Sequence, residues 1–419
     1  NATSNVVMMR VAGNTGVTLS RSSTLFQHVV CDGTSVRSVT QVDSELNTLT
    51  VLGTVTVVGN AVFAGDIQKK TAGTSNFAAG VNAGNSIASG GNYNVAIGDE
   101  AGTAITTGDN NVAVGYAALD ANSTGHSNVA VGTNALSANI THVANTMVGY
   151  QAGLSTVADA NTFVGYQCGQ TTTTGTNNTA LAVNALYSNT SGSNNTAIGR
   201  EALYSNTTAS GNVAVGYQAL DANTTGTSNV AFGIGALGAN TTASNNSAFG
   251  ATSLDANTTG TQNNAFGVNA LTANTTASYN SAFGTSALGT NTTGASNSAF
   301  GQTALTANTT GYANTAVGAS AQAATTTGVN NTAVGASALD ALTTSHNNTA
   351  VGTSALGATT TGAQNVALGT SAGSSLTTGT NNICIGYNSQ LAAVGDGNEI
   401  VIGNSSATGK GSDTGFITG

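Results

Sequence analysis

The stretch Asn212-Val-Ala-Val-Gly216-Tyr-Gln-Ala-Leu220 is one copy of a motif that fills most of this 419-residue chain. The motif has the form Asn-x-Ala-φ-Gly-x-x-Ala-Leu, in which φ is Val, Ile or Phe, and a polar stretch such as Asp-Ala-Asn-Thr-Thr-Gly-x-x completes the unit. A β-branched or aromatic residue beside Gly favours a strand over a helix. The motif therefore predicts short strands separated by turns.

The spacing of the motif predicts how the units are arranged. The motif glycine recurs every 17 residues from Gly98 to Gly403, with one spacing of 16 after Gly149 and with Ala182 in place of one glycine. A unit this short cannot fold alone, so successive coils must bury one another. We therefore predict an all-β solenoid or β-roll, each coil having two short strands and two turns. At about 4.8 Å per stacked coil, nineteen intervals predict a rod on the order of 90 Å long.

The composition agrees with an ordered, uniformly paired chain. There is no Pro, and Pro would remove a donor from a strand ladder. Charged residues make up 5% of the chain and apolar residues 39%, which is unlike the charged, apolar-poor composition of disordered chains. Five of the seven basic residues precede residue 71, so no basic stripe predicts a nucleic-acid partner. No apolar run approaches the ~18 residues of a membrane span, so we expect no membrane insertion.

The residue types that carry chemistry form no recognisable site. The three cysteines lie far apart. Cys168 and Cys384 occupy repeat positions usually held by Ala, so we expect both to be small apolar fillers. The four histidines show no recurring spacing to a carboxylate. One repeat position carries acids only in scattered coils: Asp120, Asp221, Asp255 and Asp340. We predict no catalytic, cofactor-binding or metal-binding residues and no enzymatic activity.

The two faces of each strand suggest an assembly. Neighbouring strand residues point to opposite faces, and we expect φ and the motif Leu inside the coil. The Ala before φ would then lie outside with Gly, as a seam of small residues pressed against sister chains. This hypothesis predicts a parallel homotrimer. The alternative is that Ala and Gly only keep a thin roll flat.

Asparagine recurs at two places in the unit. The Asn that opens each unit is expected to stack into a ladder of side-chain amides. A second Asn, seven residues after the motif Gly, begins an Asn-x-Ser/Thr sequon and is a candidate N-glycosylation site. The alternative is turn chemistry at a corner of the coil. The ten candidate residues are Asn122, Asn139, Asn189, Asn206, Asn223, Asn240, Asn257, Asn274, Asn291 and Asn308.

The chain divides by pattern into four segments. Residues 1–45 alternate like strands and predict a small N-terminal β-domain for attachment or subunit joining. Residues 46–75 predict a narrow β connector, residues 76–403 the repeat solenoid, and residues 404–419 a C-terminal end. Because the chain begins with Asn1 and not Met, we expect a leader or a larger N-terminal part to precede it.

The motif resembles two families of fibrous proteins. Asn94-Val-Ala-Ile-Gly98 and Asn195-Thr-Ala-Ile-Gly199 are similar to the head repeats of trimeric autotransporter adhesins, which form a trimeric β-roll of the YadA type, although the period of 17 is longer. The longer form through Gly216-Tyr-Gln-Ala-Leu220 resembles the shafts of phage and other viral tail fibres. Residues 398–419 look like a shaft end that precedes a self-cleaving chaperone domain in such fibres.

The resemblance implies a structural fibre shaft that supports host attachment at a virion surface. Its expected partners are two further copies of the chain, a virion baseplate or neighbouring fibre subunit, and a host surface receptor or glycan. The alternative function is a secreted or cell-surface adhesin or extracellular fibril, with glycans on the sequons. A solenoid lyase acting on polysaccharide is a third class, but the repeat supplies no recurring pair of acids for it.

Overall fold

The computed structural model describes residues 17–19, 27–29, 73–404, 408–412 and 414–417. The chain divides into two compact units, Asn1–Ile67 and Gln68–Gly419. In the first unit, β1 (Val17–Leu19) pairs antiparallel with β2 (Gln27–Val29). Apart from these strands and residues 73–75, the predicted N-terminal β-domain and connector lie outside the described residues.

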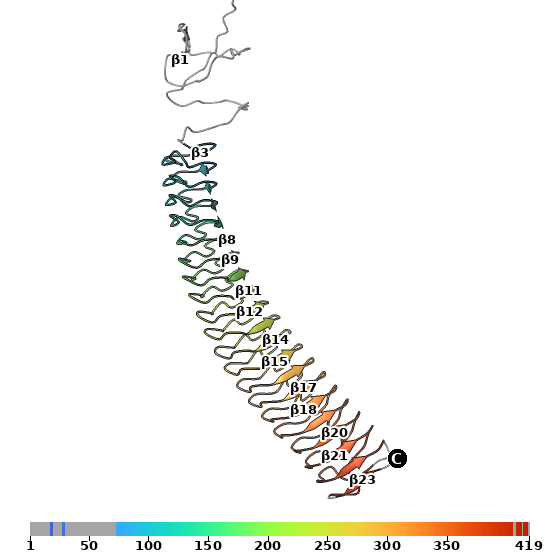
Figure 1. The fold of residues 1–419 in the computed structure, drawn as a ribbon. Coiled ribbons are helices and arrows are strands. Elements are labelled where there is room, and N and C mark those ends of the chain that lie inside the picture. Colours follow the sequence, from blue (N-terminus) through green and yellow to red (C-terminus); the bar gives the residue numbers. More distant parts are fainter. Residues whose placement is uncertain (1–16, 20–26, 30–72, 405–407, 413, 418–419) are drawn as a thin grey trace, which may run out of the picture. The chain divides into compact units, whose positions relative to one another are not determined.

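The second unit is a parallel β-solenoid, as Figure 1 shows from β3 to β23. Each strand has three residues and pairs in parallel with the strand of the next coil, as Ala214 does with Ala231. The described residues contain no helix. The predicted all-β solenoid with a 17-residue repeat is therefore confirmed. The strands are β3 (Phe77–Ala79), β4 (Val95–Ile97), β5 (Val112–Val114), β6 (Val129–Val131), β7 (Thr146–Val148), β8 (Thr162–Val164), β9 (Thr179–Leu181), β10 (Thr196–Ile198), β11 (Val213–Val215), β12 (Val230–Phe232), β13 (Ser247–Phe249), β14 (Asn264–Phe266), β15 (Ser281–Phe283), β16 (Ser298–Phe300), β17 (Thr315–Val317), β18 (Thr332–Val334), β19 (Thr349–Val351), β20 (Val366–Leu368), β21 (Ile383–Ile385), β22 (Ile400–Ile402) and β23 (Gly415–Ile417).

Each coil contains one strand, so the prediction of two strands per coil was wrong. We number the coil from the opening Asn as position 1, which places the strand at positions 2–4, the motif Gly at 5 and the motif Leu at 9. In the coil 263–279, positions 7 and 9 have left-handed backbones, with φ of 57° at Asn269 and 54° at Leu271. A second strand cannot form there, because strands need extended backbones.

Hydrogen bonds to both neighbouring coils hold this left-handed segment. The backbone N–H of Asn269 donates to the carbonyl of Ala251 in the preceding coil at 3.1 Å, and that of Leu271 donates to Ala287 in the following coil at 3.0 Å. Position 5 is glycine for a steric reason. A Cβ on Gly267, whose φ is 142°, would lie 2.6 Å from the carbonyl group of Gly284. The corner therefore stacks too closely for a side chain.

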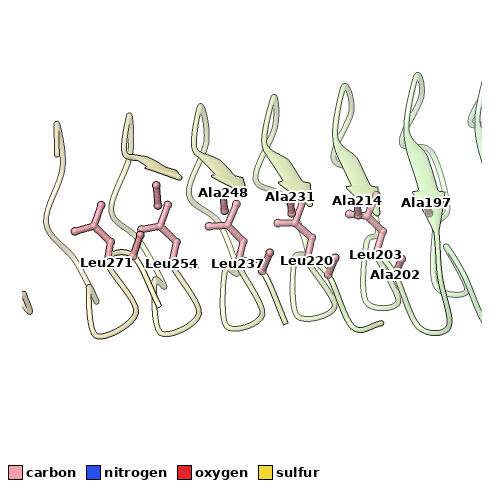
Figure 2. Packing of buried hydrophobic residues seen from close by; sticks show 14 of the residues in the cluster. Ala197, Ala202, Leu203, Ala214, Leu220, Ala231, Leu237, Ala248, Leu254 and Leu271 are labelled. Carbon is pink, nitrogen blue, oxygen red and sulfur yellow. The ribbon is translucent and has the colours of Figure 1, made fainter. Parts of the chain in front are cut away.

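The core contains Ala at positions 3 and 8 and Leu at position 9. Figure 2 shows the leucine ladder beside the strand alanines. Residues such as Ala248 and Leu254 are 0% exposed, whereas Phe232 and Leu181 at position 4 are 39% and 46% exposed. The prediction that φ lies inside the coil was wrong. The reason is volume, because a coil of 17 residues encloses one leucine-sized side chain per turn together with small ones.

Substitutions along the core conserve this volume. Where position 3 is large, as at Met147 and Phe163, position 9 is glycine instead of leucine. A Cβ on Gly169 would lie 2.3 Å from the Phe163 ring. Where Gly102 stands at position 9, Ile105 at position 12 occupies the space. The interior therefore holds a near-constant amount of apolar volume, as close packing requires.

This packing also shows that the prediction of an alanine seam in contact with sister chains was wrong. The strand alanines, such as Ala96, Ala214 and Ala231, are 0% exposed in the isolated coil, so they cannot contact another chain. The outward side of the strand carries the larger residues of positions 2 and 4. Any association between copies must use that side or another outer surface.

A compensated substitution tests the volume constraint. We expect Ala265→Phe to destabilise its coil by about 1–3 kcal/mol, because Leu271 fills the space that the ring needs. The double variant Ala265→Phe/Leu271→Gly reproduces the pairing of Phe163 with Gly169 and should recover most of the loss. Native-state hydrogen exchange of the strands β13–β15 measures both changes. Equal protection in the single and double variants would show that the interior is not volume-limited.

Candidate functional site

The coil interior contains a ladder of position-1 asparagines. The side-chain Oδ1 of Asn246 accepts from the backbone N–H of Asn263 in the next coil at 3.0 Å, and its Nδ2 donates to the carbonyl of Gly260 in its own coil at 2.9 Å. The side chain thus takes the place of a backbone carbonyl in the ladder between coils. It also ties the start of the strand to the corner at position 15.

A second amide ladder lies at position 12. Asn257 donates through Nδ2 to the Gly260 carbonyl at 2.9 Å and to Oδ1 of Asn240 in the preceding coil at 3.1 Å. Two buried side-chain amides, from positions 1 and 12, therefore converge on one backbone carbonyl. Buried polar groups are stable when each finds such partners, and here the partners are supplied in every coil that has both asparagines.

The two ladders differ in continuity. Asn76 to Asn382 form an unbroken first ladder, in which each Oδ1 accepts the backbone N–H of the next coil. The predicted stacking of the opening asparagines is confirmed. The second ladder spans Asn122–Asn139 and Asn189–Asn308 and is replaced elsewhere by Thr or by buried aliphatic residues. The aliphatic replacements are Ile87, Ile105, Leu342 and Leu376.

The first ladder ends at a buried carboxylate. The backbone N–H of Glu399 donates to Oδ1 of Asn382 at 2.9 Å, and the Glu399 side chain is 0% exposed. Its carboxylate accepts from the backbone N–H groups of Ala392 at 3.1 Å and Gly411 at 2.9 Å. Glu399 thus links the last complete coil to the segment that follows it. Its role is to hold the end of the stack together.

All ten sequon asparagines are members of the second ladder. Each is 0% exposed. In Asn223, for example, Nδ2 donates to Asn206 Oδ1 at 3.1 Å and to the Gly226 carbonyl at 3.0 Å. A glycan would have to be joined to that nitrogen. The structure therefore favours the alternative of turn chemistry for Asn122, Asn139, Asn189, Asn206, Asn223, Asn240, Asn257, Asn274, Asn291 and Asn308.

Mass spectrometry tests the ladder role of these asparagines. We expect peptides that contain Asn223 and Asn240 to carry no glycan, even when the chain is secreted from eukaryotic cells and folds there, because a glycosylated Nδ2 cannot enter the coil. Enzymatic removal of N-glycans, which converts a glycosylated Asn to Asp, should cause no such change at Asn223 or Asn240. A glycan at either position in folded protein would contradict the burial.

The threonine pairs of the corner point in two directions. At position 13, Thr224 donates its hydroxyl to the carbonyl of Thr241 in the next coil at 3.1 Å. At position 14, the side chains of Thr225 and of its equivalents in every coil from Thr242 to Thr378 are exposed. One row therefore serves the backbone, and the other forms an uncharged outer edge.

Of the acids singled out in the sequence, Asp221 and Asp255 approach each other: a Cβ on Gly238 would lie 3.7 Å from Asp221 Oδ1 and 2.7 Å from Asp255 Oδ1. Asp221 and Asp255 stand two coils apart with Gly238 between them, and partial burial raises the pKa of both carboxyls above the ordinary range. Burial raises the pKa of Cys168 to about 12, which is that of an inert thiol.

Among the described residues, no three His, Cys, Asp or Glu side chains form a group that could bind a metal. In the same part of the chain, no helix has the length and hydropathy needed to cross a membrane.

The sequence contained a signal for the second ladder that the sequon interpretation did not use. Position 12 changes from Asn to Ile or Leu in some coils, as at Ile105 and Leu342. A solvent-facing glycosylation site would not be exchanged for a buried aliphatic residue.

Comparison with known proteins adds no functional assignment: no protein-family model matches the chain, and no curated protein matches it.

Matched substitutions in one coil should separate the two ladders. Asn246→Leu leaves the buried backbone N–H of Asn263 without its acceptor, which costs about 1–3 kcal/mol, and adds a side chain at the crowded strand start. Asn257→Leu removes only side-chain bonds and recreates the pair found at Leu339 and Leu342. We expect Asn246→Leu to destabilise the coil more than Asn257→Leu does. Hydrogen exchange of β13–β15 measures both losses. Equal losses would mean that the two ladders are equivalent.

Proposed function

We propose that this chain is the structural shaft of a viral tail fibre, of the phage type, that holds a virion at a distance from its host surface. The observation that carries the proposal is the unbroken first amide ladder from Asn76 to Asn382. Every coil is bonded to the next in the same way, and this uniformity suits a part whose task is length and stiffness. Its proposed location is the virion surface or another extracellular position.

The proposal includes the partners that such a shaft needs. Copies of the chain would associate in parallel as a homotrimer. One end would join a virion baseplate or a neighbouring fibre subunit, and the other would present a receptor-binding or glycan-binding part to the host. We expect no catalytic activity, because the repeat supplies no nucleophile with a supporting base. The similarity of the repeat to fibre shafts and to YadA-type heads supports this function through sequence alone.

A deletion in whole coils tests the role in setting length. Removing residues 212–313 joins position 17 of one coil to position 1 of another and should shorten the rod by about 29 Å, at about 4.8 Å for each of six coils. Electron microscopy of negatively stained rods measures the change. As a control, deletion of residues 212–321 joins position 17 to position 9, breaks the repeat phase and should interrupt the stack at the junction, because each coil depends on its neighbours. A rod of unchanged length after the in-phase deletion would overturn the proposal.

Purification distinguishes the shaft from an extracellular fibril. A tail-fibre shaft should copurify with tailed particles and be absent from particle-free filament fractions. Filaments shed without capsids would favour the second candidate, a secreted or cell-surface adhesin or fibril. The structure makes the glycosylated form of that candidate the weaker one, because the sequon amides are buried.

A further inference from the structure

The outward side of the strands forms one continuous apolar face. Every strand from β4 to β22 ends at position 4 in Val, Ile, Leu or Phe, from Ile97 to Ile402. These side chains are partly exposed, for example by 38% at Ile97 and 50% at Leu368. Isolated exposed apolar residues need no explanation, but a contiguous stripe of this length marks an interaction surface.

Five phenylalanines make the middle of this face bulkier than its ends. Phe232, Phe249, Phe266, Phe283 and Phe300 stack on one another with ring centroids 4.6–5.1 Å apart and interplanar angles of 6–8°. We call these five residues the Phe block. Elsewhere the same row consists of aliphatic residues. A partner could therefore be matched to this face in its length and also in the place of the bulky Phe block.

The flanking rows carry almost no charge. Position 2 lies two residues before the row in the same strand, and position 6 follows the corner glycine. Between Val213 and Tyr387 neither position carries a charged residue. Beside the Phe block, Ile234 and Val268 are 61% and 47% exposed. At position 6 the charged residues in the coils of β4–β22 are Asp99 and Arg200, and position 2 beside the Phe block carries Ser or Asn in four coils. A partner for this face must therefore be largely uncharged, with an apolar row opposite position 4.

The exposed area is sufficient for a stable contact. With about 150–250 Å² for an aromatic side chain, the 39% exposure of Phe232 and Phe300 leaves on the order of 60 Å² at each of these two rungs. The nineteen rungs from β4 to β22, together with the exposed side chains at positions 2 and 6, therefore offer an area of the same order as the ~800 Å² that each partner buries in a standard interface. A second copy of the same chain has the required length, period and lack of charge.

We propose that positions 2, 4 and 6 of β4–β22 form the surface on which a second copy of this chain docks, parallel and in register, with Phe block against Phe block. A shift by one coil would place a phenylalanine opposite a valine at each end of the block and leave gaps. An antiparallel copy that matched the two blocks would leave β4 and β5 uncovered. The proposed surface depends on the proposed shaft function in one respect only. That function sets the number of associated copies at three.

Charge placed on the face tests the interface. Phe249→Glu/Phe266→Glu/Phe283→Glu should convert the associated full chain to monomers, measured by sedimentation velocity at micromolar concentration, with the β-sheet circular dichroism retained. The matched control Thr259→Glu/Thr276→Glu/Thr293→Glu adds the same charge to the same three coils on the exposed row at position 14. This control should keep the mass of the wild type. Monomeric wild-type protein, or equal masses in the two triple variants, would overturn the proposal.

Cross-linking tests the orientation without charged substitutions. In a Cys31→Ser background, where Cys168 and Cys384 are buried, Ser247→Cys and Ser281→Cys each place one thiol on the face, one coil to either side of Asn264. A short bismaleimide should link each variant to itself when the copies are parallel and in register. Linkage only in a mixture of the two variants would mean an antiparallel pair, and no linkage would mean no interface here. Either result overturns the proposal, while the shaft function is judged separately by the length change on deletion.

Discussion

The backbone carbonyl at position 15 is the point on which each coil depends. In the coil that begins at Asn246, the amides of Asn246 and Asn257 both donate to the Gly260 carbonyl at 2.9 Å. The first amide fixes the start of the strand, and the second fixes the opposite wall. Both amides also bond to a neighbouring coil. Closure of a coil and stacking of coils are therefore one hydrogen-bond network, and in a repeat protein the stability of each unit rests on such contacts with its neighbours.

The small interior explains the rest of the architecture. With two amide ladders inside, the space that remains fits one leucine and two alanines, so large strand residues must face outward. The left-handed residues at positions 7 and 9 are uncommon for non-glycine side chains, and hydrogen bonds to the coils on both sides compensate for them. The same geometry brings Leu271 into the core and leaves Phe266 half-buried on the surface. The apolar outer face is thus a consequence of how narrow the coil is.

Sequence reasoning predicted the properties that depend on periodicity, but not those that depend on volume. The spacing of 17 and the opening asparagines were enough for the solenoid and its first ladder. The face assignment was wrong because it placed the larger residue, such as Phe232, inside and the smaller Ala231 outside. The exchange of Leu for Gly at position 9 beside Met147 and Phe163 contained the correction, since only residues that share a space compensate in size. The association of copies cannot be deduced from a period, because it depends on what the outer surface leaves uncovered.

Stacking also explains why the outer face is apolar and not charged. Residues at one position of successive coils are direct neighbours, about 4.8 Å apart, and like charges at that distance destabilise a ladder. The acids at position 10 agree with this, because Asp221 and Asp255 are separated by Gly238 and Asp340 is followed by Gly357. A long uniform stack must therefore present neutral rows, some polar like the threonines at position 14 and some apolar like position 4. Water solvates the first kind well. The second kind is stabilised when another neutral row of the same period covers it, and the proposed docking of copies would supply such a row.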